Sequence, residues 1–344
     1  MLKATRALPM VLILAACGGD ADPDAKFEAQ VVTAMHDSIG DELADLVQAS
    51  IDLQAAAPSG HGWDATADAG AIAEMTAAWR RTRIAYEHVE GATAPIFAGA
   101  DVTMDARYDT FLASLSGTGD QDLFDDRGVT GMHAIERILY APTIRANVTA
   151  FEQTLPGYRA AAFPATAAEA NEFKTKLVQK LVDDASQLHD EWTPAAIDIG
   201  VAYLGLVGLM NEQKEKVNLA ATGEEESRYS QVTLFDLRNN LAGTMKVYAF
   251  FEAWVASKRG DENEKIHAGF DALDALYSGA SGDALPPVPE TWSSDAPTAA
   301  DRATPFGQMW VGVHAAVDPA TSGSVVYEMN EVAVKLGFPE FVAQ

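Results

Sequence analysis

The chain has 344 residues, of which 48% are apolar, a size and composition that suit one large domain or two small ones with a sizeable core. Asp and Glu total 50 against 24 Lys and Arg, which gives a formal net charge of −26. This charge repels phosphate backbones and argues against nucleic acid as a partner, and its simplest interpretation is solubility.

Residues 1–16 are predicted to be a lipoprotein signal peptide. A short basic start precedes an apolar run of about ten residues, which is too short to cross a bilayer as a helix. The run ends in small residues before Cys17, the single cysteine of the chain, and this arrangement is typical of an acylated cysteine. Lipid on Cys17 would hold the protein on a membrane without a transmembrane helix. The alternative is an ordinary signal peptide that happens to contain a cysteine.

Residues 17–26 are predicted to form the acylated cysteine and a flexible tether, because the segment is rich in Gly and Asp. The residue after Cys17 is Gly18 and not the Asp that commonly retains lipoproteins at the inner membrane. We therefore expect the protein in the cell envelope, lipid-anchored to the periplasmic face of the outer membrane or to the cell surface.

The remainder of the chain has the apolar periodicity of helices. Phe27 to Ala56 places apolar residues at three- and four-residue spacing, and strand-forming runs are scarce throughout. Pro194 is expected in the first turn of the helix that runs through 201–219. Further helices are predicted over 71–89, 104–115, 128–141, 173–188, 201–219, 234–255, 266–276, 309–317 and 325–336, with loops over 117–126 and 285–305. No linker divides residues 27–344, so the prediction is one all-α domain of packed helical bundles.

One pair of residues has the spacing of metal ligands. His133 and Glu136 are three apart, so on a helix they share a face. An imidazole nitrogen and a carboxylate can then reach one cation, and such ligands suit iron, zinc or manganese. Taken alone the spacing arises often by chance, and it differs from the HExxH pattern of common zinc peptidases.

Four blocks around this pair occur in a characteristic order. They are WRRTRIAYEHVE at 79–90, DARYD at 105–109, TGMHAIERIL at 130–139, and GEEESRYS at 223–230 followed by Asp236, Asn240 and Gly243. Over nearly all of residues 27–344 the chain resembles the imelysin (peptidase M75) family, and most of all its EfeO and EfeM branch. The tract after the last block departs from that branch, since Gln231 and Thr233 stand where a His and an Asp are usual.

The resemblance implies a fold of two packed four-helix-type bundles in one domain, facing the periplasm and linked to the uptake of iron or another metal ion. It implies that His133 and Glu136 are metal ligands. Glu90, Asp105 and Glu225 match acidic positions of the other blocks and are predicted to complete the site. The alternative role of these three acids is helix capping or pairing with nearby arginines.

Three functions are compatible with such a site. The first is a metal-binding protein whose ion is iron in preference to zinc, with a membrane iron permease or a peroxidase as partner. The second is a zinc-type metallopeptidase of the M75 family, with Glu225 or Glu90 as general base, although a second histidine ligand is not evident. The third is a binder of acidic polysaccharide through a bridging cation. The prediction is metal binding and not catalysis.

Overall fold

The computed structural model describes residues 23–115, 119–258 and 260–343. Within these ranges the regular secondary structure is helical and no strand occurs, so the predicted all-α class is confirmed. No helix of the described part combines the length and the apolar character needed to cross a membrane. The signal peptide, Cys17 and the tether up to residue 22 lie outside the described residues, and their assignments stay predictions.

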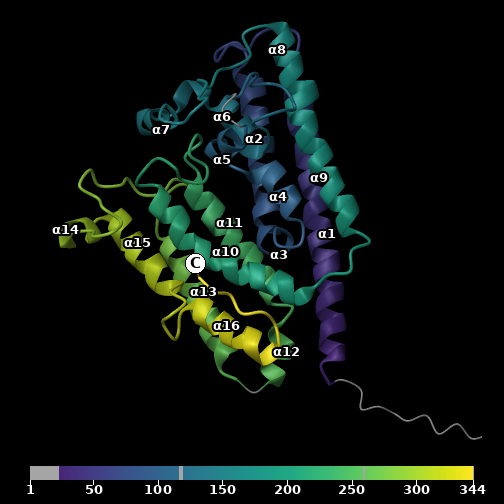
Figure 1. Ribbon diagram of the computed structural model, residues 1–344, viewed down its shortest axis with the longest axis vertical. Helices are drawn as coiled ribbons and strands as arrows, with labels where there is room; N and C mark the ends of the chain where they lie inside the picture. The colour runs from purple at the N-terminus through teal and green to yellow at the C-terminus, as the bar shows by residue number, and fades with distance from the viewer. Residues whose placement is uncertain (1–22, 116–118, 259, 344) are drawn as a thin grey trace, which may run out of the picture.

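The first half of the chain forms a bundle around the longest helix, α1. In Figure 1 this helix (purple) runs beside α9 (teal), and α2 packs along α1 while α6 contacts α2 and α9. The elements are α1 (Ala25–Ala56), α2 (Ala69–Glu87), α3 (Glu90–Thr93), α4 (Ala98–Asp105), α5 (Tyr108–Ser114), α6 (Gly131–Leu139), a 3-10 turn (Ala141–Thr143), α7 (Ala146–Glu152), α8 (Ala167–Glu172), a π-helical turn (Phe173–Leu177) and α9 (Val178–Trp192).

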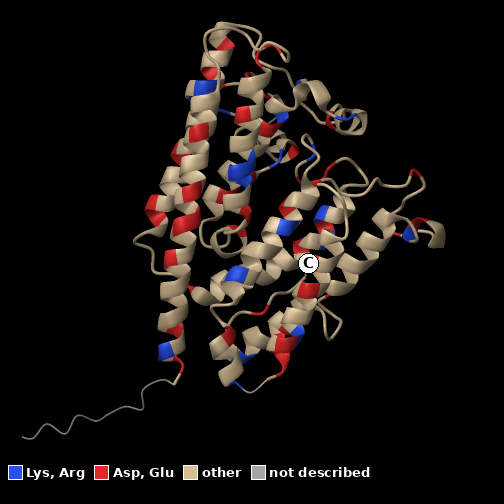
Figure 2. Ribbon diagram, turned by 180° about the vertical axis from the view of Figure 1, so that it is seen from behind, with Lys and Arg blue, Asp and Glu red and all other residues tan. Residues whose placement is uncertain are grey.

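The second half forms another bundle, in which α10 contacts α11, α15 and α16 and α13 contacts α11, α15 and α16. Its elements are α10 (Ile199–Leu219), α11 (Thr233–Tyr248), α12 (Glu252–Ser257), α13 (Glu262–Ser278), α14 (Ala299–Arg302), α15 (Pro305–Ala316) and α16 (Val325–Leu336). The bundles join where α10 packs on α3 and α11 packs on α2 and α3. Acidic residues are spread over the helices of both halves and outnumber basic ones in the back view (Figure 2).

The prediction of one helix over 104–115 is wrong, because the chain forms two helices there, α4 and α5. Ala106 and Arg107 are extended, with ψ of 140° and 159°. Tertiary contacts on either side of the break explain it. Asp105 is turned toward Arg83, while Arg107 Nη1 donates a hydrogen bond of 3.2 Å to the Glu224 carbonyl.

Several other boundaries differ from the sequence prediction. Pro194 lies in a turn, and α10 begins at Ile199, where the Asp198 carboxylate accepts hydrogen bonds from the first-turn amides. The helix expected over 234–255 ends at Tyr248 and resumes as α12. Short helices also lie where none was predicted, among them α7, α8 and α14. α1 begins at Ala25, two residues before its expected start.

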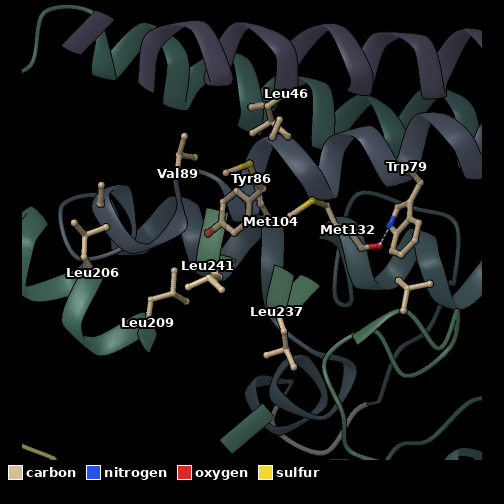
Figure 3. Close-up of a cluster of buried hydrophobic side chains, with 14 of the residues drawn as sticks. Leu46, Trp79, Tyr86, Val89, Met104, Met132, Leu206, Leu209, Leu237 and Leu241 are labelled. Atoms are coloured by element: carbon tan, nitrogen blue, oxygen red, sulfur yellow. Dashed lines mark hydrogen bonds between the residues drawn. The ribbon is translucent and has the colours of Figure 1, made fainter. Parts of the chain in front are cut away.

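Apolar side chains hold in place the helices that carry the polar residues described below. Figure 3 shows Met104 of α4 and Met132 of α6 converging in the core, with the Trp79 indole N–H donating to the Met132 carbonyl oxygen at 3.0 Å. Met104 directly precedes Asp105, and Met132 directly precedes His133. Both methionines are fully buried, so the packing of each limits where the next residue can point.

Two glycines allow the close approaches on which this arrangement depends. Gly131 begins α6 with φ of 81°, and a Cβ at that position would lie 2.5 Å from the Met104 carbonyl oxygen. A Cβ at Gly243 of α11 would lie 2.4 Å from the His88 carbonyl oxygen. No other residue type fits at these distances, so α6 can meet α4, and α11 can meet the corner between α2 and α3.

We expect Gly131→Ala to lower the free energy of unfolding by about 2 kcal/mol or more, because the left-handed φ and the backbone clash both penalise a Cβ. Urea denaturation followed by circular dichroism measures the loss. The matched control is Gly70→Ala in α2, where a Cβ meets nothing within 4 Å. This control should leave stability unchanged or raise it slightly, and equal losses in the two variants would show that the close approach at Gly131 is unimportant.

Candidate metal centre

His133 lies in α6 with only 1% of its surface exposed. Its Nδ1 is 2.9 Å from Glu136 Oε2, whereas Nε2 has no hydrogen-bond partner among the residues that the structure describes. Nε2 faces two carboxylates, at 3.5 Å from Asp105 Oδ1 and 3.7 Å from Glu226 Oε1. These distances exceed those of an N–H···O hydrogen bond. A buried nitrogen therefore faces two acids without bonding to either.

The three side chains fit a metal ion. The ligand atoms of Asp105, His133 and Glu226 lie within 4.8 Å of one another. Metal–ligand bonds of about 2.0–2.2 Å separate neighbouring ligand atoms by roughly 2.8–3.6 Å at octahedral or tetrahedral angles, close to the separations from Nε2 to the two acids. One imidazole nitrogen with carboxylate oxygens suits iron, zinc or manganese.

Glu136 shares a face with His133, as its spacing predicts, but it holds the imidazole and does not point with it at a common cation. One carboxylate oxygen of Glu136, Oε2, contacts His133 Nδ1. The other accepts hydrogen bonds from the Tyr229 amide (3.1 Å), the Ser230 amide (2.8 Å) and the Ser230 hydroxyl (2.7 Å). A carboxylate on Nδ1 favours the tautomer that leaves Nε2 free for a metal. Glu136 therefore has the geometry of an orienting residue.

A second group of acids lies next to the first and shares Asp105 with it. Ligand atoms of Glu90, Asp101 and Asp105 are within 4.8 Å of one another. They line a cavity of about 330 Å³ between α3, α4 and α10, whose lining also includes Glu226, Glu212, Glu215, Lys216, Arg107 and the exposed Val102. The cavity thus reaches Asp105 and Glu226, the two acids that face His133, and half of its lining residues are acidic.

Arg83 of α2 neutralises the inner part of this acidic group. Its guanidinium is fully buried and hydrogen-bonds Asp105 and Glu87, with Asp236 at 3.4 Å and Glu226 at 3.7 Å. Burial lowers the pKa of Arg83, but the surrounding carboxylates outweigh it and the pKa is raised overall. The arginine therefore stays charged and joins α2 to α4 and α11.

The titrating groups of the centre compensate one another. Burial raises the pKa of Asp105 to about 7, against the opposing charges of Arg83 and His133. Burial lowers the pKa of His133, but the adjacent carboxylates of Glu136 and Glu226 raise it to about 9. Burial also raises the pKa of Glu226, and Lys216, His133 and Arg83 together bring it well below its ordinary value. Without a metal, a proton on the imidazole supplies positive charge between the carboxylates.

The loop between α10 and α11 is held by a separate network. Arg137 of α6 forms an ion pair with Glu152 at 3.0 Å, and the Tyr229 hydroxyl donates to the same carboxylate at 2.5 Å. Arg228 donates to Asp109 of α5 at 3.0 Å. These contacts fix the backbone amides of residues 229 and 230, which are the amides that bind Glu136.

The structure brings together some of the residues predicted from the sequence and not others. His133 and Asp105 belong to the first group, with Glu226. Glu90 and Asp105 belong to the second group, with Asp101. Glu136 contacts the first group only through His133. Glu225 is in neither group. Its carboxylate lies beside Thr233 and Arg145, and burial raises its pKa to about 7.

Two acids of the centre were missed in the sequence. Glu226 is the last residue of an acidic triplet, and sequence pattern alone could not choose among its three members. Asp101 lies outside the four blocks and carries no signal in its spacing. The alternative role predicted for these acids, pairing with nearby arginines, is also present, because Asp105 forms an ion pair with Arg83.

Replacing Arg83 should be costly. We expect Arg83→Met to lower the free energy of unfolding by about 3–5 kcal/mol, because four carboxylates lose a buried partner. Arg81→Met is the matched control on the same helix, since Arg81 forms a largely exposed pair with Asp52. It should change stability by no more than about 1 kcal/mol. Urea denaturation measures both, and a small loss for Arg83→Met would refute the compensating role.

Comparison with known proteins identifies the family and agrees with the helical fold. The family model described as imelysin (peptidase M75) matches residues 32–300. EfeM/EfeO family lipoproteins of Staphylococcus aureus, among them those of strains MSSA476 and NCTC 8325, are 26% identical over 205 residues. The matched region is 60% of this chain and 58% of theirs, so the chain aligns with less than two thirds of the length of these relatives.

Two solved structures resemble the whole fold. An imelysin-like protein of Psychrobacter arcticum gives a TM-score of 0.57 at 12% identity and covers 92% of this chain and 98% of its own. A protein of Parabacteroides distasonis, described as a candidate iron-regulated protein A precursor, gives a TM-score of 0.57 at 13% identity and covers 92% and 96%. At these identities the likeness concerns the fold alone.

Proposed function

The chain belongs to the imelysin (M75) family, and from this premise we propose that it is a lipid-anchored protein of the cell envelope that binds a metal ion, iron above all, for uptake. The observation that carries the proposal is the buried His133 Nε2, which lacks a hydrogen-bond partner in the described structure and faces Asp105 and Glu226. The relatives named EfeM/EfeO family lipoproteins and the neighbour named for iron regulation support the same function.

The ligand set supports iron as the cargo. One imidazole with two carboxylates is rich in oxygen, and such sites suit harder cations, with zinc as the alternative ion. Glu90 and Asp101 extend the acidic lining outward along the cavity. Carboxylates along one path raise the local concentration of cations and guide them inward.

The proposed anchor is the acylated Cys17, which would place the domain on the periplasmic face of the outer membrane or on the cell surface. A membrane iron permease or a peroxidase is the partner expected to take the ion. The acidic surface is compatible with this location, because it leaves the protein soluble beside the membrane.

The geometry supports cargo binding over peptide hydrolysis. A metallopeptidase needs a general base next to an open coordination position. Glu90 accepts a hydrogen bond of 2.8 Å from Asn240 and lies 3.7 Å from Lys216, and Glu225 lies outside both acid groups. Neither acid considered as a base in the sequence is therefore free beside His133.

Two neighbouring acids provide a sharp test of the site. We expect Glu226→Gln to weaken the binding of ferrous iron by about tenfold or more, because it removes a charged ligand, whereas Glu225→Gln should bind as the wild type does. His133→Ala should lower the affinity about 100-fold or more, and His267→Ala, at a half-exposed histidine of α13, serves as its control. Anaerobic equilibrium dialysis with metal analysis measures all four variants.

Metal content that is equal in wild type and His133→Ala would overturn the proposed site. Hydrolysis of a denatured protein that is abolished both by chelator and by His133→Ala would favour the peptidase. Circular dichroism of each variant separates a loss of binding from a loss of folding.

The orienting role of Glu136 predicts an intermediate effect. In Glu136→Gln the amide oxygen can still accept from residues 229 and 230, but the His133 contact loses its charged acceptor. We expect affinity for the metal to fall by about 10–100-fold, the range typical of residues that hold a ligand in place. The same dialysis measures it. A loss as large as that of His133→Ala would instead indicate direct ligation by Glu136.

A further inference from the structure

Lys216 of α10 lies inside the acidic cavity and not at the surface. It is 5% exposed, and its ammonium is 3.2 Å from Glu226 Oε2 and 3.7 Å from Glu90 Oε2. A lysine is rarely buried unless its charge is paired, so this position has to be explained by the carboxylates around it. The ammonium thus lies between two carboxylates of the acidic cavity.

Glu226 connects this ammonium to the proposed metal ligands. Its Oε1 faces His133 Nε2, whereas its Oε2 faces the Lys216 ammonium. Lys216 and His133 therefore face different oxygens of the same carboxylate. A single carboxylate that is shared by two cation positions binds each of them less strongly, because the two positive charges repel each other.

The ammonium is fixed in its position. It donates a hydrogen bond of 3.0 Å to the Asn240 side-chain oxygen, and the Asn240 amide group donates in turn to Glu90 at 2.8 Å and to Glu87. Burial lowers the pKa of Lys216, but Glu226 and Glu90 outweigh it and the pKa is raised overall. The charge is therefore permanent at neutral pH.

Arg83, the other buried cation of the cluster, does not share the position of Lys216 in the cavity. Its guanidinium bonds Glu87 and Asp105 and also lies near Asp236, so it connects α2 with α4 and α11. It does not line the cavity, whereas Lys216 does. Of these two cations, Lys216 is the one that an entering ion would meet.

We propose that Lys216 is a built-in counter-cation that occupies a second cation position of the metal centre. It limits the chain to one metal ion and lowers the affinity for that ion, so that the ion can be released to an acceptor. This inference rests on the proposed function, since it concerns the regulation of the same site.

The test removes the charge of Lys216 and keeps a side chain of similar length. Lys216→Met should bind zinc or ferrous iron at least about tenfold more tightly than the wild type, or bind two ions per chain in place of one, because a unit charge close to the ion is removed. Isothermal titration calorimetry with zinc and anaerobic dialysis with ferrous iron give affinity and stoichiometry. The bound ion should also leave Lys216→Met more slowly when a chelator is added.

Two controls isolate the effect of the charge at this position. Lys214→Met removes the same charge from the same helix, at a residue that does not line the cavity, and should bind as the wild type does. Lys216→Arg keeps the charge and should keep one ion per chain at wild-type affinity within a fewfold. If Lys216→Met does not fold, Lys216→Gln is measured in its place, because its amide can still donate to Asn240.

The outcomes separate this inference from the proposed function. A wild type that binds no iron, zinc or manganese overturns the proposed function. A wild type that binds one ion, with unchanged or weaker binding in the folded neutral variant, overturns the counter-cation and leaves the metal site standing. Tighter binding in Lys214→Met as well would attribute the effect to overall charge, and would also overturn the inference.

Discussion

The arrangement of this protein depends on the compensation of buried carboxylates by Arg83 and Lys216 at the junction of its two helical bundles. An ionised carboxylate that leaves water without a partner is strongly disfavoured, so these acids can be buried only together with cations. Arg83 belongs to the first bundle and reaches Asp236 in the second. Lys216 belongs to the second and reaches Glu90 in the first. The same charged cluster therefore holds the bundles together, and Lys216, Glu90 and Glu226 from it also line the cavity.

His133 is the residue of this charged cluster at which the positive charge can change. Glu136 and the loop amides hold one side of its ring, while its other nitrogen faces acids whose charge Arg83 and Lys216 only partly neutralise. A proton or a metal ion can supply the remaining positive charge. Under the proposed function, such a centre would bind an ion in competition with protons and fixed cations, which would moderate its affinity for a cargo that is passed on.

The family name includes a peptidase, but function has to be argued from the site and not from the fold. The solved imelysin-like structures match at 12% and 13% identity and therefore support the architecture alone. In the local arrangement a single histidine faces carboxylates, and neither Glu90 nor Glu225 is free beside it to act as a general base. This arrangement favours metal binding over hydrolysis.

The sequence by itself determined the all-α class, most of the long helices and the shared helical face of His133 and Glu136, because helical periodicity and a three-residue spacing are local properties of the chain. Only the tertiary structure decided that Glu226 and not Glu225 faces His133, and that Asp101 and Lys216 belong to the cavity. It also decided the break between α4 and α5, where Asp105 and Arg107 turn toward different partners. The reason is physical: neighbouring side chains in a turn point in different directions. Which of them enters the centre depends on contacts made by Arg137, Arg228 and Tyr229 with residues far away in the chain.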